Sequence, residues 1–297
     1  MYKRQGWDTT TVTSTIATSR PRAAVLVPDF HNPTGAYMPD TQRALVGRAL
    51  ARQDTLTFID ETITEVRLDD GQAALPFAAH HPGAITVGSS SKSHWGGLRL
   101  GWIRARADLL TRLVDARVTI DLGAPVLEQL VLLHLLRQSP GMPADRREDL
   151  VRARGAAITA LRTHLPQVDF TMPAGGLSLW LRLPEATSSA RVVDAAEREG
   201  LLLAGGNRFA ATGTLDRRLR LPYVLSPGQL DEAVQRLARA VTIAGHTAYR
   251  PGQRTPPVSY THLRAHETAL DLVCRLLLET KHYPNYYPPL LTLTRPK

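Results

Sequence analysis

The sequence has little cysteine, few aromatic residues and no long hydrophobic run. Its 297 residues include one cysteine, Cys274, and 6% aromatic side chains. A single cysteine excludes a disulfide framework within the chain and a metal site built from several thiolates. No apolar run approaches the roughly 20 residues that a membrane-spanning helix needs, and no secretory signal peptide is recognisable. These absences indicate a soluble protein, and we expect it to act in the cytoplasm with no membrane partner and no metal.

The chain also lacks a block of charge of either sign. Lysine and arginine total 36 against 27 acidic residues, giving a formal net charge of +9 that is spread along the sequence. Segments that bind nucleic acids usually concentrate their basic residues in a patch or a run. The pattern therefore gives no support for nucleic-acid binding by this segment.

Both ends of the chain differ in character from the rest. Val258–Thr268 and Asp271–Leu278 resemble the translation of a sequencing adapter, and Met1–Gln5 resembles the other adapter strand. The alternative for the tail is an amphipathic helix with a proline-rich end. Segments of this kind do not contribute to the fold of a protein. We therefore expect residues 1–5 and 257–297 to be adapter-derived, the tail to be disordered, and the remainder to be a fragment of a longer protein.

Alternating strands and helices are predicted between residues 22 and 104. Ala23–Val27 is a short apolar run that ends before Pro28, which is typical of a buried strand. Strands separated by helical stretches predict a parallel sheet covered by helices on both faces. The strands are expected at 23–27, 55–60, 84–87 and 98–103, with a helix at 41–52. The sequence thus predicts an α/β fold.

A change of pattern near residue 165 predicts a second, smaller domain. Long helices are expected at 107–118, 125–137 and 143–165, and Pro166 ends the last of them. After this point Ser226 precedes Pro227 as an N-cap before a proline at the first helical position. The elements expected here are strands at 177–183, 201–203 and 219–221 and helices at 190–199 and 226–241. The predicted organisation is a partial large domain over 6–165 and a small α+β domain over 166–256.

Polar residues follow three of the predicted strands. Asn32 lies after the first strand, Asp60 ends the second, and Lys92 follows the third. Ligands of open parallel sheets bind at the carboxyl ends of the strands. Lys92 stands in Ser89-Ser90-Ser91-Lys92, seven residues before Arg99, a set that suits a Schiff base with a phosphate-carrying aldehyde cofactor. Taken singly, the Asn32 segment is typical of an ordinary turn, Asp60 of a strand-end cap, and the serine run with Lys92 of a solvated surface loop.

Considered together, these residues indicate a resemblance to a known family. The chain resembles the class I and II aminotransferases of pyridoxal-phosphate fold-type I, and within them the aminotransferase-like domain of MocR-type GntR regulators. The motifs that carry the resemblance are Phe30–Gly35, Gly97–Gly101 and Pro173–Leu177. The resemblance extends from Gly6 to about Val241. It implies a three-layer α/β/α large domain, of which the N-terminal half is missing here, a small α+β C-terminal domain, and a homodimer.

The resemblance also implies the roles of individual residues. Lys92 would hold pyridoxal 5'-phosphate as a Schiff base and move the α-proton of the substrate. Asp60 would face the pyridine nitrogen and Asn32 the phenolate oxygen of the ring. The phosphate would be bound by Ser89, Ser91 and Arg99. In the second domain Arg220 matches the arginine that binds the substrate carboxylate. Taken alone, it is more typical of a surface or salt-bridging arginine.

Two functions remain open. In the first, the protein is an aminotransferase that moves an amino group between an amino acid and a 2-oxo acid. In the second, it is the cofactor-binding effector domain of a MocR/GntR regulator, with a winged-helix domain upstream that would bind DNA. Thr62 stands where many relatives carry a tyrosine, which puts efficient turnover in question, and Trp95-Gly96-Gly97 favours the regulator. Because the missing half would leave core surface exposed, we expect the chain alone to be poorly soluble or to bind the cofactor weakly.

Overall fold

The computed structural model describes residues 6–121, 123–185, 187–210 and 214–246. The two segments predicted to be adapter-derived, 1–5 and 257–297, lie outside the described residues. None of the described helices combines the length and the hydropathy that crossing a membrane requires.

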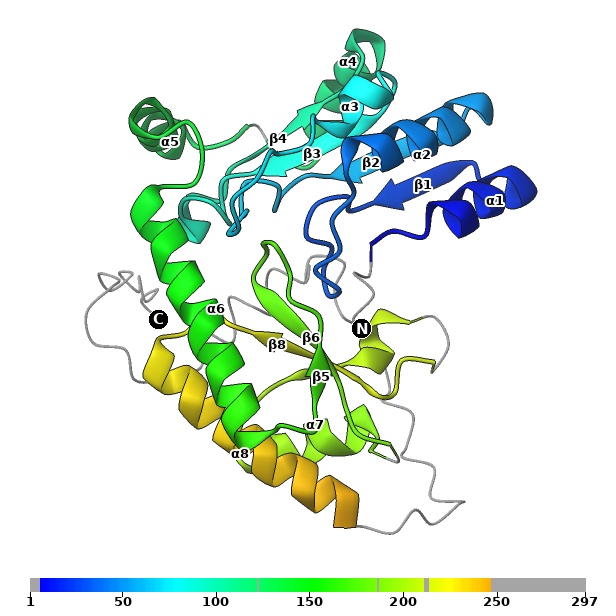
Figure 1. Ribbon diagram of the computed structural model, residues 1–297. Helices are drawn as coiled ribbons and strands as arrows, with labels where there is room; N and C mark the ends of the chain where they lie inside the picture. The colour runs from blue at the N-terminus through cyan, green and yellow to red at the C-terminus, as the bar shows by residue number, and fades with distance from the viewer. Residues whose placement is uncertain (1–5, 122, 186, 211–213, 247–297) are drawn as a thin grey trace, which may run out of the picture. The chain divides into compact units, whose positions relative to one another are not determined.

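The first sheet has four strands in the order β1-β2-β3-β4 (Figure 1). They are β1 (Ala23–Leu26), β2 (Leu56–Asp60), β3 (Ile85–Ser89) and β4 (Gly101–Arg104). The first three are parallel, as expected, whereas β4 is antiparallel to β3. A parallel crossover needs a dozen or more residues, usually with an α-helix. The short link between β3 and β4 holds only the 3₁₀ helix η1 (Gly96–Leu98), so the chain returns in the opposite direction.

Three helices cover one face of this sheet: α1 (Thr9–Ser19), α2 (Asp40–Arg52) and α3 (Phe77–His80). They enclose a core in which Ile59 of the sheet packs with Val46 and Leu50 of α2. Helix α1 was not predicted, because its run of threonines consists of poor helix formers. The helix begins where the Asp8 side chain accepts a hydrogen bond from the Thr11 amide, and only Ile16 of its residues is buried.

The opposite face of the sheet is partly exposed among the described residues, although Ile85 on it is buried. Val25, 73% exposed, lies on it together with Leu56 and Ile103, both also exposed. The helices α4 (Ala107–Arg117) and α5 (Val126–Gln138) bury none of their own residues. The expectation of exposed core surface is therefore confirmed for the described part of the chain.

The second sheet is antiparallel, with the order β5-β6-β8-β7. Its strands are β5 (Asp169–Phe170), β6 (Ser178–Arg182), β7 (Ala204–Gly205) and β8 (Arg218–Pro222). The strand expected at 201–203 is wrong, because pairing with β8 begins only at Ala204. The Leu201 amide instead donates to the Ala196 carbonyl and completes the end of the preceding helix.

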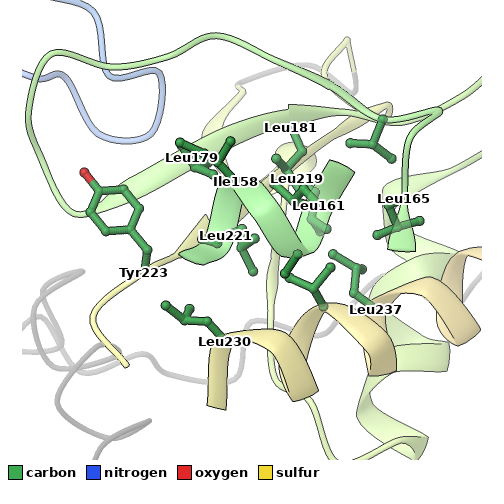
Figure 2. Packing of buried hydrophobic residues seen from close by; sticks show 14 of the residues in the cluster. Ile158, Leu161, Leu165, Leu179, Leu181, Leu219, Leu221, Tyr223, Leu230 and Leu237 are labelled. Carbon is green, nitrogen blue, oxygen red and sulfur yellow. The ribbon is translucent and has the colours of Figure 1, made fainter. Parts of the chain in front are cut away.

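Three helices complete the core of the second sheet: α6 (Ala144–His164), α7 (Ser189–Arg198) and α8 (Pro227–His246). Figure 2 shows apolar side chains of α6 and α8 packed against the leucines of β6 and β8. The labelled residues of this cluster are Ile158, Leu161, Leu165, Leu179, Leu181, Leu219, Leu221, Tyr223, Leu230 and Leu237. The helices lie within one or two residues of their expected ends, apart from α8, which runs about five residues further. The boundary near residue 165 stays a prediction.

Candidate functional site

Asn32 lies in a tight turn after β1. The His31 amide donates to the Ala36 carbonyl, and the Gly35 amide donates to the His31 carbonyl. Phe30, just before this turn, is buried and has a φ of 42°, which is unusual for a residue with a large side chain. Its ring stacks on Tyr37 with centroids 5.5 Å apart. The turn is therefore fixed by its main-chain hydrogen bonds and by the stacking of Phe30 on Tyr37. Asn32 in this turn is exposed.

Asp60 is the last residue of β2 and is half-buried. It pairs in register with Val87, so Asp60 and Ser89 lie on the same face at the carboxyl end of neighbouring strands. Its Oδ1 accepts a hydrogen bond from the Thr62 amide at 2.9 Å. Its Oδ2 has no hydrogen bond to any residue that the structure describes. One oxygen of this carboxylate can thus accept a further donor.

The turn after β3 presents Lys92 and its neighbouring hydroxyls. Ser89 Oγ donates to the Leu100 carbonyl at 3.3 Å and accepts from the Ser91 amide at 3.1 Å. Ser90 is buried and bonds to the same carbonyl. Ser91 and Lys92 are half-buried, and Ser91 Oγ has no partner within the described ranges. Of the three serines, Ser90 is structural and Ser91 has a hydroxyl free to donate.

Arg99 is exposed and adopts the left-handed conformation, with a φ of 54°, where η1 ends. Non-glycine residues in this region carry backbone strain, and such strain clusters at functional sites. Leu98 and Leu100, the residues on either side of Arg99, are both buried. Arg99 is therefore set between two anchored leucines, with its side chain in solvent.

A residue distant in sequence also contacts this turn. Arg146, in the first turn of α6, donates from Nε to the main-chain carbonyl of Lys92 at 3.1 Å. The two residues are 54 positions apart, and no local pattern distinguishes this arginine from the others on the helix. The start of α6 is thus tied to the turn that carries Lys92.

Arg220 and Asn32 are brought together from opposite ends of the chain. Arg220 Nη1 donates to Asn32 Oδ1 at 3.1 Å, across 188 positions of sequence. Arg220 is 7% exposed, and its Nε is buried without a partner in the described part of the chain. Burial lowers the pKa of Arg220, and the positive charge of Arg208 lowers it further. A buried guanidinium with a free donor is suited to binding an anion.

A second contact holds the Asn32 turn to the small sheet. Tyr223 Oη donates to the Gly176 carbonyl at 2.6 Å, and the Gly176 amide donates to the Val66 carbonyl at 2.8 Å. Gly175 lies directly against the ring of Phe30, where an added Cβ would come within 2.6 Å of a ring carbon. The Pro173–Leu177 motif is therefore a packing element, since only glycine fits at residue 175.

The predicted site residues fall into two groups. Asp60, Ser89, Ser91, Lys92 and Arg99 lie at the carboxyl edge of β2 and β3 and in the following turn and 3₁₀ helix. Asn32 and Arg220 form the second group through their hydrogen bond. Among the residues described, three or more histidine, cysteine or acidic side chains nowhere gather in the manner of a metal site. The arrangement offers a lysine amine, an open carboxylate, hydroxyls and two arginines.

Comparison with known proteins gives consistent results. The family model described as aminotransferase class I and II matches residues 2–237. The chain is 30% identical over 246 residues to 2-aminoadipate transaminase of Thermus thermophilus, covering 80% of this chain and 62% of the relative. It is 28% identical to the uncharacterised HTH-type transcriptional regulator YdfD of Bacillus subtilis, covering 62% of this chain and 39% of that protein.

The fold also matches that of a solved aminotransferase structure. It is that of LysN, the alpha-aminoadipate aminotransferase of Thermus thermophilus, in complex with N-(5'-phosphopyridoxyl)-L-leucine. The TM-score is 0.74 at 30% identity, and the match covers 82% of this chain and 64% of the other. The chain thus spans less than two thirds of the length of these relatives.

Proposed function

Because the chain belongs to the class I and II aminotransferases, we propose that its site binds pyridoxal 5'-phosphate and an amino acid and serves amino-group transfer to a 2-oxo acid. The family and its fold-type I α/β architecture, both inferred from the sequence, are confirmed. The observation that carries the proposed activity is the Arg220–Asn32 pair. It places a buried guanidinium with a free Nε beside one of the residues expected to face the cofactor ring.

The side chains present fit pyridoxal phosphate. The group needs an acceptor for its ring nitrogen, a donor for its ring oxygen, and several donors for its phosphate. Asp60 has an open Oδ2, and the Asn32 amide nitrogen makes no hydrogen bond within the described ranges. Ser91 Oγ and the solvent-facing Arg99 supply donors for a phosphate. When bound, the cofactor supplies an electron sink for the negative charge that develops at the substrate α-carbon.

Lys92 would act as the base that transfers the substrate proton. Its amine would bind the aldehyde carbon of the cofactor and, once the substrate amine has displaced it, would move the proton at the α-carbon. Asp60 would hold a proton on the ring nitrogen through its open oxygen. Lys92 is the only lysine between residues 4 and 280. This makes it the one amine of the described residues that can perform this role.

Arg220 would orient the substrate by its carboxylate. A guanidinium presents donors in a planar fork that matches a carboxylate in two parallel hydrogen bonds. Nη1 is already engaged by Asn32, while Nε is buried and unsatisfied among the described residues. An unsatisfied buried donor costs about 1–3 kcal/mol, so a bound carboxylate would relieve a cost that the protein alone bears.

A regulatory role is the second candidate. Regulators of the helix-turn-helix type are among the relatives, and two of them cover 62% and 74% of this chain. Thr62 supports this alternative, since its amide binds Asp60 while its short side chain replaces the tyrosine expected from the resemblance. In that case the same residues would bind the cofactor as a signal, and DNA would be bound by a domain outside this sequence. A homodimer and a cytoplasmic location remain part of the proposal.

Trapping the cofactor on its lysine tests the proposal. The 297-residue chain is incubated with pyridoxal phosphate, reduced with borohydride, digested and analysed by mass spectrometry. We expect a phosphopyridoxyl group on Lys92, lost in Lys92→Ala and retained in Lys281→Ala. Addition of an amino acid and a 2-oxo acid before reduction then separates turnover from sensing, because only an enzyme produces the new amino acid. Labelling of Lys281 alone contradicts the proposal.

A further inference from the structure

Arg67 stacks on two aromatic side chains next to the Asn32 turn. Its Cζ lies 4.4 Å from the ring centroid of Tyr37 and 5.4 Å from that of Phe30. The two rings also stack on each other. A guanidinium within about 6 Å of a ring centroid is attracted by the negative face of the ring, most strongly where water is excluded. Arg67, Phe30 and Tyr37 form one group of side chains, which we call the stacked cluster.

The main chain of Arg67 is anchored independently of this stacking. Arg67 forms an antiparallel bridge with Gly175, and the Leu68 amide donates to the Ala174 carbonyl at 3.0 Å. Both chain neighbours of Arg67, Val66 and Leu68, are buried. The guanidinium itself makes no hydrogen bond and no ion pair with any residue that the structure describes. Within that part of the chain, stacking is thus the interaction that fixes this side chain.

Phe30 connects the stacked cluster to the candidate site. It is buried, has a φ of 42° and precedes Asn32 by two residues. A residue with a large side chain keeps such a conformation only when its surroundings hold it there. The contacts of its ring with Tyr37 and Arg67 contribute to this constraint. Release of the ring would therefore displace Asn32, whose Oδ1 accepts the hydrogen bond from Arg220.

We propose that Arg67 is a positioning residue, whose stacking on Phe30 and Tyr37 holds the turn in which Asn32 meets Arg220. This rests on the proposed function, which assigns the substrate carboxylate to Arg220. Arg67 acts through Phe30 and is not itself a catalytic residue. Its positive charge is essential to this role, because a neutral side chain of similar length would keep the packing on the rings but lose the electrostatic attraction.

Amide hydrogen exchange in the 297-residue chain tests the turn without any ligand. The His31 and Gly35 amides donate hydrogen bonds within the turn, so their exchange reports its local opening. Arg67→Met removes the charge and should speed the exchange of both amides about fivefold, the scale of one cation–π interaction. Arg67→Lys keeps the charge and should restore most of the protection. Tyr37→Leu removes the ring instead and should act as Arg67→Met does, which keeps the test open if one variant does not fold.

Two controls separate positioning from a general loss of stability. Val46→Ala removes buried atoms from a core that includes none of the stacked cluster, so it lowers the stability of the fold without releasing the rings. Arg48→Met removes an exposed arginine of α2 and should change neither stability nor exchange. Urea unfolding gives the stability of each variant. Equal exchange of the two amides in Arg67→Met and in a Val46→Ala variant of similar stability overturns the proposal, as does equal exchange in Arg67→Met and Arg67→Lys.

Binding of pentanoate, a simple monocarboxylate, tests the consequence at Arg220. In calorimetric titrations Arg67→Met should weaken pentanoate about as much as it speeds exchange of the turn. Arg67→Lys should restore most of the affinity, and Val46→Ala should leave it unchanged where the chain is folded. Faster exchange with unchanged affinity in Arg67→Met overturns the connection from Arg67 to the carboxylate site.

Arg220→Gln separates this inference from the proposed function. If Arg220 binds the carboxylate, its replacement abolishes the binding of pentanoate whatever residue stands at position 67. Unchanged binding in Arg220→Gln, or no binding by the wild type, contradicts the carboxylate site of the proposed function and with it the positioning role of Arg67. If pentanoate binds through Arg220 and the exchange of the turn does not respond to Arg67→Met, only the role of Arg67 is overturned.

Discussion

Arg146 Nε donates a hydrogen bond of 3.1 Å to the main-chain carbonyl of Lys92. The bond joins the first turn of α6 to the turn after β3. Further along α6, Leu150, Ile158 and Leu161 are buried in the core of the second sheet. Helix α6 therefore connects the core of the second sheet to the turn that carries Lys92.

Replacing Arg146 with alanine should loosen the Lys92 turn. Loss of a charge-assisted bond to a half-buried carbonyl should cost about 1 kcal/mol of folding free energy and leave the turn less protected. We expect faster amide hydrogen exchange over residues 89–95 and slower reductive trapping of the cofactor. The matched control is Arg152→Ala on the same helix, since Arg152 is exposed and pairs only with Asp149 among the described residues. Equal exchange in the two variants would contradict the role of Arg146.

A buried ion pair stabilises the base of the Asn32 turn. Arg43 is fully buried and contacts Asp29 at 2.5 Å, while Thr64 donates to the other carboxylate oxygen. Arg43→Met leaves the Asp29 charge buried without its partner, which should cost about 3–5 kcal/mol. Urea unfolding measures the loss, and Arg48→Met, an exposed position on the same helix, should change stability little. The double variant Asp29→Asn/Arg43→Met should recover part of the loss; no recovery contradicts the explanation.

The stability of the chain should fall at high pH through Tyr223. Burial raises the pKa of Tyr223 above its ordinary value of 10.0, so the folded state keeps the hydroxyl protonated where the unfolded state loses its proton. Its contribution is therefore constant below about pH 10 and declines as the pH rises beyond that value. Tyr223→Phe removes the donor to the Gly176 carbonyl and should cost about 1–2 kcal/mol near neutral pH.

The difference in unfolding free energy between wild type and Tyr223→Phe isolates this effect from the other tyrosines. It should shrink when the urea titrations are repeated above about pH 10. A difference that grows or stays constant with pH would show that the buried hydroxyl does not titrate as its surroundings require.

The parts of the structure that depend on local sequence could be predicted. Short apolar runs identified the strands ending near Leu26, Asp60 and Ser89, because a buried strand must present apolar side chains to its neighbours. The order and spacing of Asn32 and Lys92 identified the family. Both kinds of signal extend over a few residues and need no knowledge of how distant segments meet.

The remaining features depend on contacts between distant positions. Three such contacts leave no local pattern in the sequence: the hydrogen bond from Arg146 to Lys92, the packing of Phe30 on Gly175, and the hydrogen bond from Arg220 to Asn32. The exposed apolar surface of the first sheet was expected from the family resemblance rather than from its strands, whose composition is typical of fully buried strands. An apolar strand indicates that a face is normally covered, but not which segment covers it.

The contact between Gly175 and Phe30 gives the sharpest packing test. A Cβ at residue 175 would meet the Val66 carbonyl and come within 2.6 Å of the Phe30 ring. Phe30 cannot retreat easily, since it is buried, stacked on Tyr37 and held at a positive φ. Gly175→Ala should therefore displace the turn that carries Asn32, at a cost of about 1–3 kcal/mol, the usual range for overpacking.

Gly155→Ala is the matched control, because a Cβ there meets nothing within 4 Å in the middle of α6. Alanine in a helix interior should raise stability by about 0.5–1 kcal/mol. Pentanoate is a simple carboxylate whose binding to Arg220 can be measured by calorimetry. Its affinity shows whether displacement of the Asn32 turn affects the carboxylate site at Arg220. Gly175→Ala should weaken it, because the Asn32 partner of Arg220 moves, whereas Gly155→Ala should leave it unchanged. If both variants bind the acid as the wild type does, the Phe30 contact supports folding without positioning Asn32.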